Sequence, residues 1–308
     1  MIPEKRNPAF AHSFETIGLP VITSHGCCMN CAYCVEPRMT DRVTVRPEEE
    51  IIHELVRIAD QYPDVFEIFF VNTEFNIPTP DHSLGLVKQI LARGLEKRFH
   101  FSSQFLPIRF NEEYAEHLSR AGFYVILTCD SFSDPILKLN NSPYREKDIV
   151  HTLDLLERFQ IRCTLNLIFG LPGETLDTMD HTLEMIKRYT VQGSGQIKFE
   201  YTAGARIYNN TGLARYVKRH HVSGQVYGKS SKGYPRPCFF CSPASPRELN
   251  AAIEPKLPFK QEFVPSRPEE DRIFRKIAFY TDRETFKDAT QLFSRAPLQI
   301  KSRIFDYL

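Results

Sequence analysis

The chain has 308 residues, of which 42% are hydrophobic and 25% charged, an ordinary composition for a globular protein. Its 39 Lys and Arg nearly balance 38 Asp and Glu, so no long-range field recruits nucleic acid or an anionic membrane. No stretch approaches the ~20 consecutive apolar residues that span a bilayer, and no apolar run follows the first residues as in a signal peptide. We expect a cytoplasmic protein with reduced thiols.

Strand and helix patterns alternate from residue 19 to residue 201. Apolar runs predict strands, and apolar residues repeating at helical spacing predict the helices between them. The expected strands are 19–23, 65–71, 99–101, 123–128, 161–169 and 197–201. The expected helices begin at Pro47, Ser83, Asn111, Asp148 and Thr175. About six βα units with short connections predict an α/β fold, a partial (β/α)6 TIM-like barrel, with ligand sites at the C-terminal strand ends.

The alternation stops after about residue 210. Residues 222–237 are rich in Gly, Ser, Lys and Pro, and residues 256–268 form a Pro-rich connector. Residues 272–280, 284–293 and the last ten have helical patterns. We therefore expect three parts: an N-terminal segment (1–16), a core barrel (17–210), and a small, mostly helical C-terminal extension that caps the barrel (211–308).

Four of the eight cysteines lie between residues 27 and 34. Cys27, Cys31 and Cys34 have the spacing C-x3-C-x2-C, with Tyr33 before the last cysteine. Three thiolates can hold three irons of a [4Fe–4S] cube and leave the fourth iron open for chemistry. The alternative is a structural zinc ion with His25 or Cys28 as fourth ligand, in a zinc-stabilised binding module. No second cysteine knuckle lies close in sequence, which favours the cluster.

This run resembles the signature of the radical S-adenosylmethionine (SAM) superfamily, in which C-x3-C-x2-C follows the first strand. Further stretches follow later strands in the order that this family shows: 72–74, 129–134, 168–174 and 203–208. The resemblance covers roughly residues 17–210. It implies a [4Fe–4S] cluster held by Cys27, Cys31 and Cys34 as the catalytic centre, with SAM as the second cofactor.

The resemblance also implies roles in SAM binding. Glu74 would accept a hydrogen bond from the SAM ammonium group, and Ser131 and Asp134 would contact the ribose and the methionyl end. Tyr33 would lie against the adenine edge. The alternatives are a surface carboxylate for Glu74 and turn caps for Ser131 and Asp134.

The remaining expected cofactor contacts lie at other strand ends. Gly170 and Gly173 would let the backbone approach the adenine, because a Cβ would obstruct it, although both also suit a turn before a helix. Asn72 and Ala203 complete the expected SAM-binding set.

Other stretches, residues 74–78, 205–212 and 239–243, look like those of cobalamin-domain radical SAM enzymes, in which a large cobalamin-binding domain precedes the cysteine loop. Here 26 residues precede Cys27. We therefore expect no cobalamin.

Cys238 and Cys241 form a C-x2-C pair, and thiols at this spacing suit a soft ion. They are expected to be a substrate site, a redox pair, part of an auxiliary cluster with Cys129 or Cys163, or inert. Arg206 and Tyr208 are either substrate-facing or structural.

In most of the family, reductive cleavage of SAM yields the 5′-deoxyadenosyl radical. We therefore expect a radical SAM enzyme that acts on a small-molecule substrate and takes electrons from a one-electron donor such as flavodoxin or ferredoxin. One alternative breaks a different C–S bond and transfers the aminocarboxypropyl group to a thiophilic acceptor such as arsenite, as in arsinothricin-type enzymes. Another is a tRNA-modifying radical SAM enzyme, suggested by basic residues between 215 and 236, although the near-neutral net charge argues against RNA.

Overall fold

The computed structural model describes residues 18–40, 42–63, 65–228 and 238–258, which fall in one compact unit. Six parallel strands form its main sheet in the order β1-β4-β5-β6-β7-β8. Their bounds are β1 Leu19–Ile22, β4 Glu67–Val71, β5 His100–Phe105, β6 Tyr124–Asp130, β7 Cys163–Phe169 and β8 Ile197–Ala203. The spatial order of the strands follows the chain, which confirms the partial TIM-like barrel.

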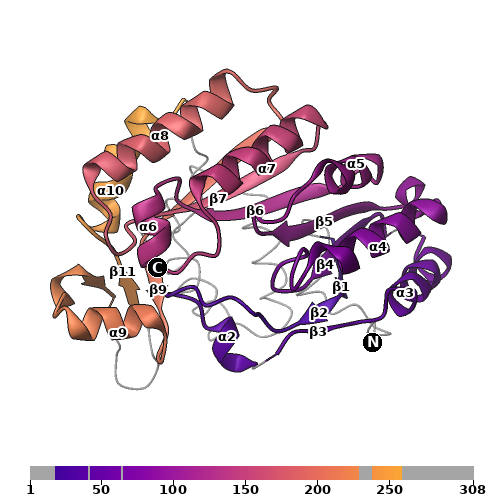
Figure 1. Ribbon diagram of the computed structural model, residues 1–308, viewed down its shortest axis with the longest axis horizontal. Helices are drawn as coiled ribbons and strands as arrows, with labels where there is room; N and C mark the ends of the chain where they lie inside the picture. The colour runs from indigo at the N-terminus through magenta and orange to yellow at the C-terminus, as the bar shows by residue number, and fades with distance from the viewer. Residues whose placement is uncertain (1–17, 41, 64, 229–237, 259–308) are drawn as a thin grey trace, which may run out of the picture. The chain divides into compact units, whose positions relative to one another are not determined.

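Helices follow the strands and cover one side of this sheet (Figure 1). They are α3 Glu48–Gln61, α4 Pro80–Ala92, α5 Glu112–Arg120, α6 Asp134–Leu139, α7 Glu146–Arg158 and α8 Leu176–Val191. The start of α5 was predicted correctly: Asn111 Oδ1 accepts a 2.8 Å hydrogen bond from the Tyr114 amide, and two acids occupy the first turn. Tyr114 and Leu118 then lie buried on the inner face.

For the preceding helix, α4, the predicted start at Ser83 was wrong. The helix α4 begins at Pro80, whose fixed φ suits the first helical position, and Thr79 precedes it. Ser83 lies in the first turn, where its buried hydroxyl is 2.8 Å from the Tyr114 hydroxyl. The side chain that looked like a cap instead joins α4 to α5.

The core beside β4, β5 and β6 consists largely of phenylalanine. The ring centroid of Phe70 lies 5.4–6.0 Å from the ring centroids of Phe75, Phe101 and Phe123. All four side chains are almost fully buried. Burying such a side chain contributes about 1.5–3 kcal/mol. This rigid centre supports the loops at the strand ends.

A small antiparallel sheet follows the sixth parallel strand. Its order is β10-β11-β9, with β9 Ala205–Ile207, β10 Val226–Tyr227 and β11 Cys238–Phe240. The helices α9 Gly212–Arg219 and α10 Pro246–Ile253 accompany it. The strands β9 and β11 pair across the expected domain boundary at residue 210. The N-terminal segment and the expected helices after residue 258 lie outside the described residues.

The cysteine loop lies between β2 Ser24–His25 and the short helix α2 Glu36–Met39. The strand β2 pairs with β3 Thr44–Val45, which closes the loop at its base. In the part of the chain that the structure describes, no helix has the length and apolar character needed to cross a bilayer.

Candidate active site

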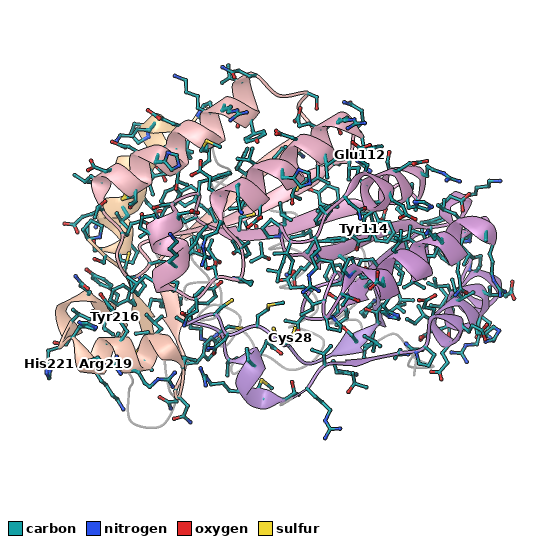
Figure 2. The ribbon with its side chains drawn as sticks, in the orientation of Figure 1. Cys28, Glu112, Tyr114, Tyr216, Arg219 and His221 are labelled. Carbon is teal, nitrogen blue, oxygen red and sulfur yellow. The ribbon has the colours of Figure 1, made fainter. Side chains whose placement is uncertain are left out.

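The three expected cluster ligands lie in the loop after β2, on the side of the sheet where the parallel strands end (Figures 1 and 2). Cys27 is buried, whereas Cys31 and Cys34 are half-buried. Burial raises the pKa of the Cys27 thiol to about 11 and also raises those of Cys31 and Cys34. Repulsion from neighbouring thiolates adds to the rise at Cys27, repulsion from Asp130 and the other two thiolates adds to it at Cys31, and the Glu36 and Glu74 carboxylates add to it at Cys34. Three thiolates gathered here need a compensating cation.

The donor set fits an iron–sulfur cluster. In a cube each thiolate binds its own iron, so the three sulfurs need not converge on one point. Among the described residues, no three His, Cys, Asp or Glu side chains are gathered closely enough to hold a single metal ion. Cys28, which is one residue out of register, is exposed (Figure 2). The residues that would hold the cluster are thus Cys27, Cys31 and Cys34.

A buried carboxylate holds the cysteine loop from the end of β6. Asp130 accepts hydrogen bonds from the Tyr33 hydroxyl (2.5 Å), the Ser142 hydroxyl (2.8 Å) and the Tyr144 hydroxyl (2.9 Å). Its backbone φ is +52°, at a register shift between β6 and β7. Burial raises the pKa of this carboxyl group, and its three hydrogen-bond donors oppose the rise.

The same loop is fixed through its backbone at Ala32. Its amide donates to the Asn140 carbonyl (2.8 Å), and its carbonyl accepts from the Leu213 amide at the start of α9 (2.7 Å). The Tyr33 ring packs against a buried cluster that includes Leu171 and Phe240. The peptide between the second and third cysteines is therefore held by the end of α6 and by the start of α9.

Glu74 lies just beyond β4 and is 9% exposed. Its Oε2 is buried and has no hydrogen-bond partner within the described residues, and burial, with repulsion from Asp130, raises its pKa well above the usual range. An unpartnered carboxylate oxygen in such a place is costly unless a donor or cation from a ligand meets it. The surface-carboxylate alternative is thus wrong.

Asn72 and Thr73 connect neighbouring loops. The Asn72 amide nitrogen donates to Thr23 Oγ1 (3.0 Å) and Ser103 Oγ (3.2 Å), and its buried Oδ1 has no partner among the described residues. The Thr73 hydroxyl donates to the Gly26 carbonyl at the start of the cysteine loop (3.0 Å). Asn72 thus leaves one acceptor for a ligand.

Ser131 and Asp134 make the contacts that the turn-cap alternative describes. Ser131 Oγ accepts from the Ser133 amide (3.0 Å). Asp134 Oδ1 accepts from the Glu146 amide at the start of α7 (2.8 Å). Within the described residues, neither side chain forms a hydrogen bond to the cysteine loop. Their roles in SAM binding stay predictions.

The glycines after β7 make room for side chains of the protein itself. A Cβ on Gly170 would lie 2.6 Å from the Cys241 sulfur, and one on Gly173 would lie 2.7 Å from Leu139 Cδ2. Both glycines have φ near +88°. Internal packing and backbone conformation therefore suffice to require glycine at both positions. Ala203 ends β8 and is half-buried.

The expected second cysteine site combines one buried and one half-buried thiol, and its role stays a prediction. Cys241 is fully buried against Gly170 and Gly204, whereas Cys238 Sγ is 3.5 Å from the Gly228 carbonyl. Cys238 begins β11, and Cys241 directly follows the end of that strand.

The two cysteines expected to join this pair in an auxiliary cluster lie within the main sheet. Cys129 and Cys163 are buried inside β6 and β7. The Arg206 guanidinium lies 4.8 Å from the centroid of the Tyr208 ring, so these two residues contact each other.

Two buried acids were missed by sequence reasoning. Asp130 ends an otherwise apolar strand, and an acid in that position was the available signal. Glu174 is 5% exposed, accepts from the Gly170 amide (3.3 Å) and the Thr178 hydroxyl (2.5 Å), and has its pKa raised to about 7 by burial.

Sequence comparison assigns the class. Residues 21–186, more than half of the chain, match the family described as the Radical SAM superfamily, and the chain belongs to it. Its cofactors are a [4Fe–4S] cluster and SAM, and the chain is an enzyme of this class. The zinc-stabilised binding module is therefore wrong.

Individual curated relatives share less than a third of their aligned residues with this chain. The chain is 28% identical to tRNA-2-methylthio-N(6)-dimethylallyladenosine synthase of Syntrophus aciditrophicus over 60% of this chain and 41% of that protein. It is 26% identical to tryptophan 2-C-methyltransferase of Streptomyces laurentii over 63% and 34%. The chain thus spans less than half the length of these relatives.

Solved structures share the fold. The methyltransferase TsrM from Kitasatospora setae, with cobalamin and a [4Fe–4S] cluster bound, superposes with a TM-score of 0.64 at 17% identity, covering 91% of this chain and 61% of that one. The cobalamin-dependent radical enzyme OxsB gives 0.61 at 16%, covering 94% and 45%. Both likenesses cover more of the chain than the parallel sheet and its helices alone.

Proposed function

We propose that this protein binds SAM at the strand ends and uses it in radical chemistry on a small-molecule substrate. The observation that carries the proposal is the buried, unpartnered Oε2 of Glu74 beside the three-cysteine loop. The SAM ammonium group is a cation with three donors, which would satisfy this oxygen and offset the buried charge. The unpaired Oδ1 of Asn72 offers a second acceptor close by in sequence.

In this proposal the side chains of the protein hold the cluster and orient SAM. Cys27, Cys31 and Cys34 would hold a [4Fe–4S] cluster, which supplies low-potential one-electron chemistry at the sulfonium of SAM. Tyr33 keeps the cysteine loop in place through Asp130, and Glu74 orients the methionyl end. The buried surroundings of these groups exclude water from reactive species.

Support for a small-molecule substrate comes from the fold neighbours. One TsrM structure contains its tryptophan substrate and a SAM analogue, and it covers 77% of this chain with a TM-score of 0.61. The tRNA-modifying relatives support a second candidate, tRNA modification. The near-neutral charge of the chain favours the small molecule.

Anaerobic reconstitution with iron and sulfide, reduction with dithionite and mass spectrometry of the SAM products test the proposal. 5′-Deoxyadenosine would support hydrogen abstraction, and methylthioadenosine would support aminocarboxypropyl transfer. The Cys31→Ala variant should form neither product, while Cys28→Ala should behave like the wild type. If the wild type yields neither product and retains no iron, the proposal is wrong.

A further inference from the structure

The positive charge of this chain is concentrated in one segment. Residues 201–247 contain eight Lys and Arg and no Asp or Glu, although acids and bases nearly balance over the whole chain. Such an asymmetry indicates a surface that meets an anionic partner. The segment includes β9, α9 and β11.

Within this segment, α9 separates apolar and cationic side chains. Leu213, Tyr216 and Val217 pack into the buried cluster that also holds the Tyr33 ring. Arg215, Lys218 and Arg219 are exposed and lie at i, i+3 and i+4, so they share the opposite face. We call these three residues the cationic face of α9.

No carboxylate neutralises the cationic face within the described residues. Arg215 donates to the Asn210 carbonyl (3.0 Å), and none of the three cations forms a recorded ion pair. Some exposed cations elsewhere do pair, as Lys88 does with Glu113 at 2.6 Å. Cations in a last turn stabilise the helix dipole, which accounts for Lys218 and Arg219, but Arg215 lies nearer the start.

The helix that carries this face is attached to the cysteine loop. The Leu213 amide at its start donates to the Ala32 carbonyl, between Cys31 and Cys34. A Cβ on Gly212 would lie 3.0 Å from the same carbonyl, so helix and loop are in direct contact. Figure 2 shows Arg219 and His221 at the outer end of α9. A partner bound there lies one short helix, about 12 Å, from the loop.

We propose that the cationic face of α9 is the docking surface for an acidic one-electron carrier protein, an inference that rests on the proposed function. The reduced cofactor of the carrier would give up one electron to the cluster that Cys27, Cys31 and Cys34 would hold; no bond would form or break and no proton would be transferred. The footprint of three cations on one short helix suits a transient electron-transfer contact, which is small.

RNA would also meet a cationic surface, but the neighbouring rings argue against it. Base recognition uses aromatic rings that are free to stack. The Tyr216 ring is engaged with His220 (4.4 Å) and Phe240 (5.8 Å), and Tyr208 lies under Arg206. The rings of Tyr216 and Tyr208 are therefore already in contact with other side chains of the protein.

The test compares a triple charge reversal, Arg215→Glu, Lys218→Glu and Arg219→Glu, with a matched control. The control reverses three exposed cations on other elements, Arg93→Glu, Lys187→Glu and Lys198→Glu, so net charge is equal. Two measurements are made: fluorescence anisotropy of labelled bacterial flavodoxin binding to each protein, and the rate at which reduced flavodoxin bleaches the cluster absorbance. Bleaching by dithionite reports whether each cluster is intact.

We expect the α9 reversal to weaken flavodoxin binding and slow flavodoxin-driven bleaching by about tenfold or more, with dithionite bleaching unchanged. The control should stay within about twofold of the wild type, and wild-type binding should weaken as salt rises. If the triple reversal misfolds by circular dichroism, Lys218→Ala with Arg219→Ala should give a smaller loss in the same direction.

Flavodoxin binding that is equal in the wild type and the α9 variants would overturn the docking proposal. So would loss of binding to a single-stranded RNA oligonucleotide in the variant with flavodoxin binding unchanged, because the face would then serve RNA. Absence of any cluster absorbance in the wild type would instead contradict the proposed function. The anisotropy measurement needs no cluster and still decides the docking question.

Discussion

The Tyr33 hydroxyl donates a 2.5 Å hydrogen bond to Asp130, 97 residues further along the chain. This bond joins the residue before the third loop cysteine to the end of β6. Asp130 also accepts hydrogen bonds from the Ser142 and Tyr144 hydroxyls. One buried carboxylate therefore joins the cysteine loop, the end of β6 and the loop before α7. The contact from Tyr33 ties the cysteine loop to the end of β6.

Replacing Tyr33 by Phe should lower the free energy of unfolding of the apoprotein by about 1–3 kcal/mol, the value of a hydrogen bond to a buried acid. The ring packing is kept, so only the hydrogen bond is removed. Urea unfolding measures the loss, and iron retained after gel filtration should also fall. Tyr216→Phe is the matched control, because that hydroxyl has no recorded hydrogen bond in the described part. Equal stability of the two variants would show that the Tyr33–Asp130 bond contributes nothing.

Replacing Glu74 by Gln should weaken SAM binding by about 10- to 100-fold, because a charge-assisted hydrogen bond becomes a neutral one. Equilibrium binding of SAM to the reconstituted protein measures this without turnover. Glu67→Gln is the control, since Glu67 is exposed at the opposite end of β4. Unchanged affinity in Glu74→Gln would remove this residue from the SAM site.

Replacing Gly170 by Ala should destabilise the protein more than replacing Gly94 by Ala. Both glycines have positive φ, which costs an L-residue about 1–2 kcal/mol. A Cβ at Gly94 meets nothing within 4 Å, whereas one at Gly170 meets the Cys241 sulfur at 2.6 Å. Adding Cys241→Ala to Gly170→Ala should recover part of the difference in urea unfolding. Equal costs at the two glycines would contradict the packing argument.

The stability of the protein should fall as pH rises from about 4.5 to about 7 because of Glu174. Burial raises the pKa of this carboxyl from 4.5 to about 7, so the folded state binds the proton more tightly than the unfolded state. This contribution to the free energy of unfolding is fully present below pH 4.5, the pKa in the unfolded state, and is lost as the pH rises to about 7, the pKa in the folded state. The total loss is on the order of 3 kcal/mol. Urea unfolding at several pH values should show this slope in the wild type relative to Glu174→Gln. Parallel pH profiles would place the Glu174 pKa near its ordinary value.

Local pattern was enough to predict the repeating units and the cysteine ligands. Apolar runs and helix starts such as Asn111 depend on residues within a few positions of one another, so the six parallel strands followed from the chain itself. The spacing of Cys27, Cys31 and Cys34 is likewise a local property, and it indicated the class of chemistry.

Contacts between distant residues were decided only by the tertiary structure. Glycine at position 170 suggested room for a ligand, but the fold places the Cys241 sulfur there. The fold also buries Cys241 against Gly170 and Gly204, whereas Cys238 at the start of β11 is only half-buried. The burial of Glu74 and the bond from Tyr33 to Asp130 depend on how loops from separate strands meet. The sequence determines which ionisable groups are present. The burial and the hydrogen bonds that set the pKa of a carboxylate arise only when the fold brings the strand ends together.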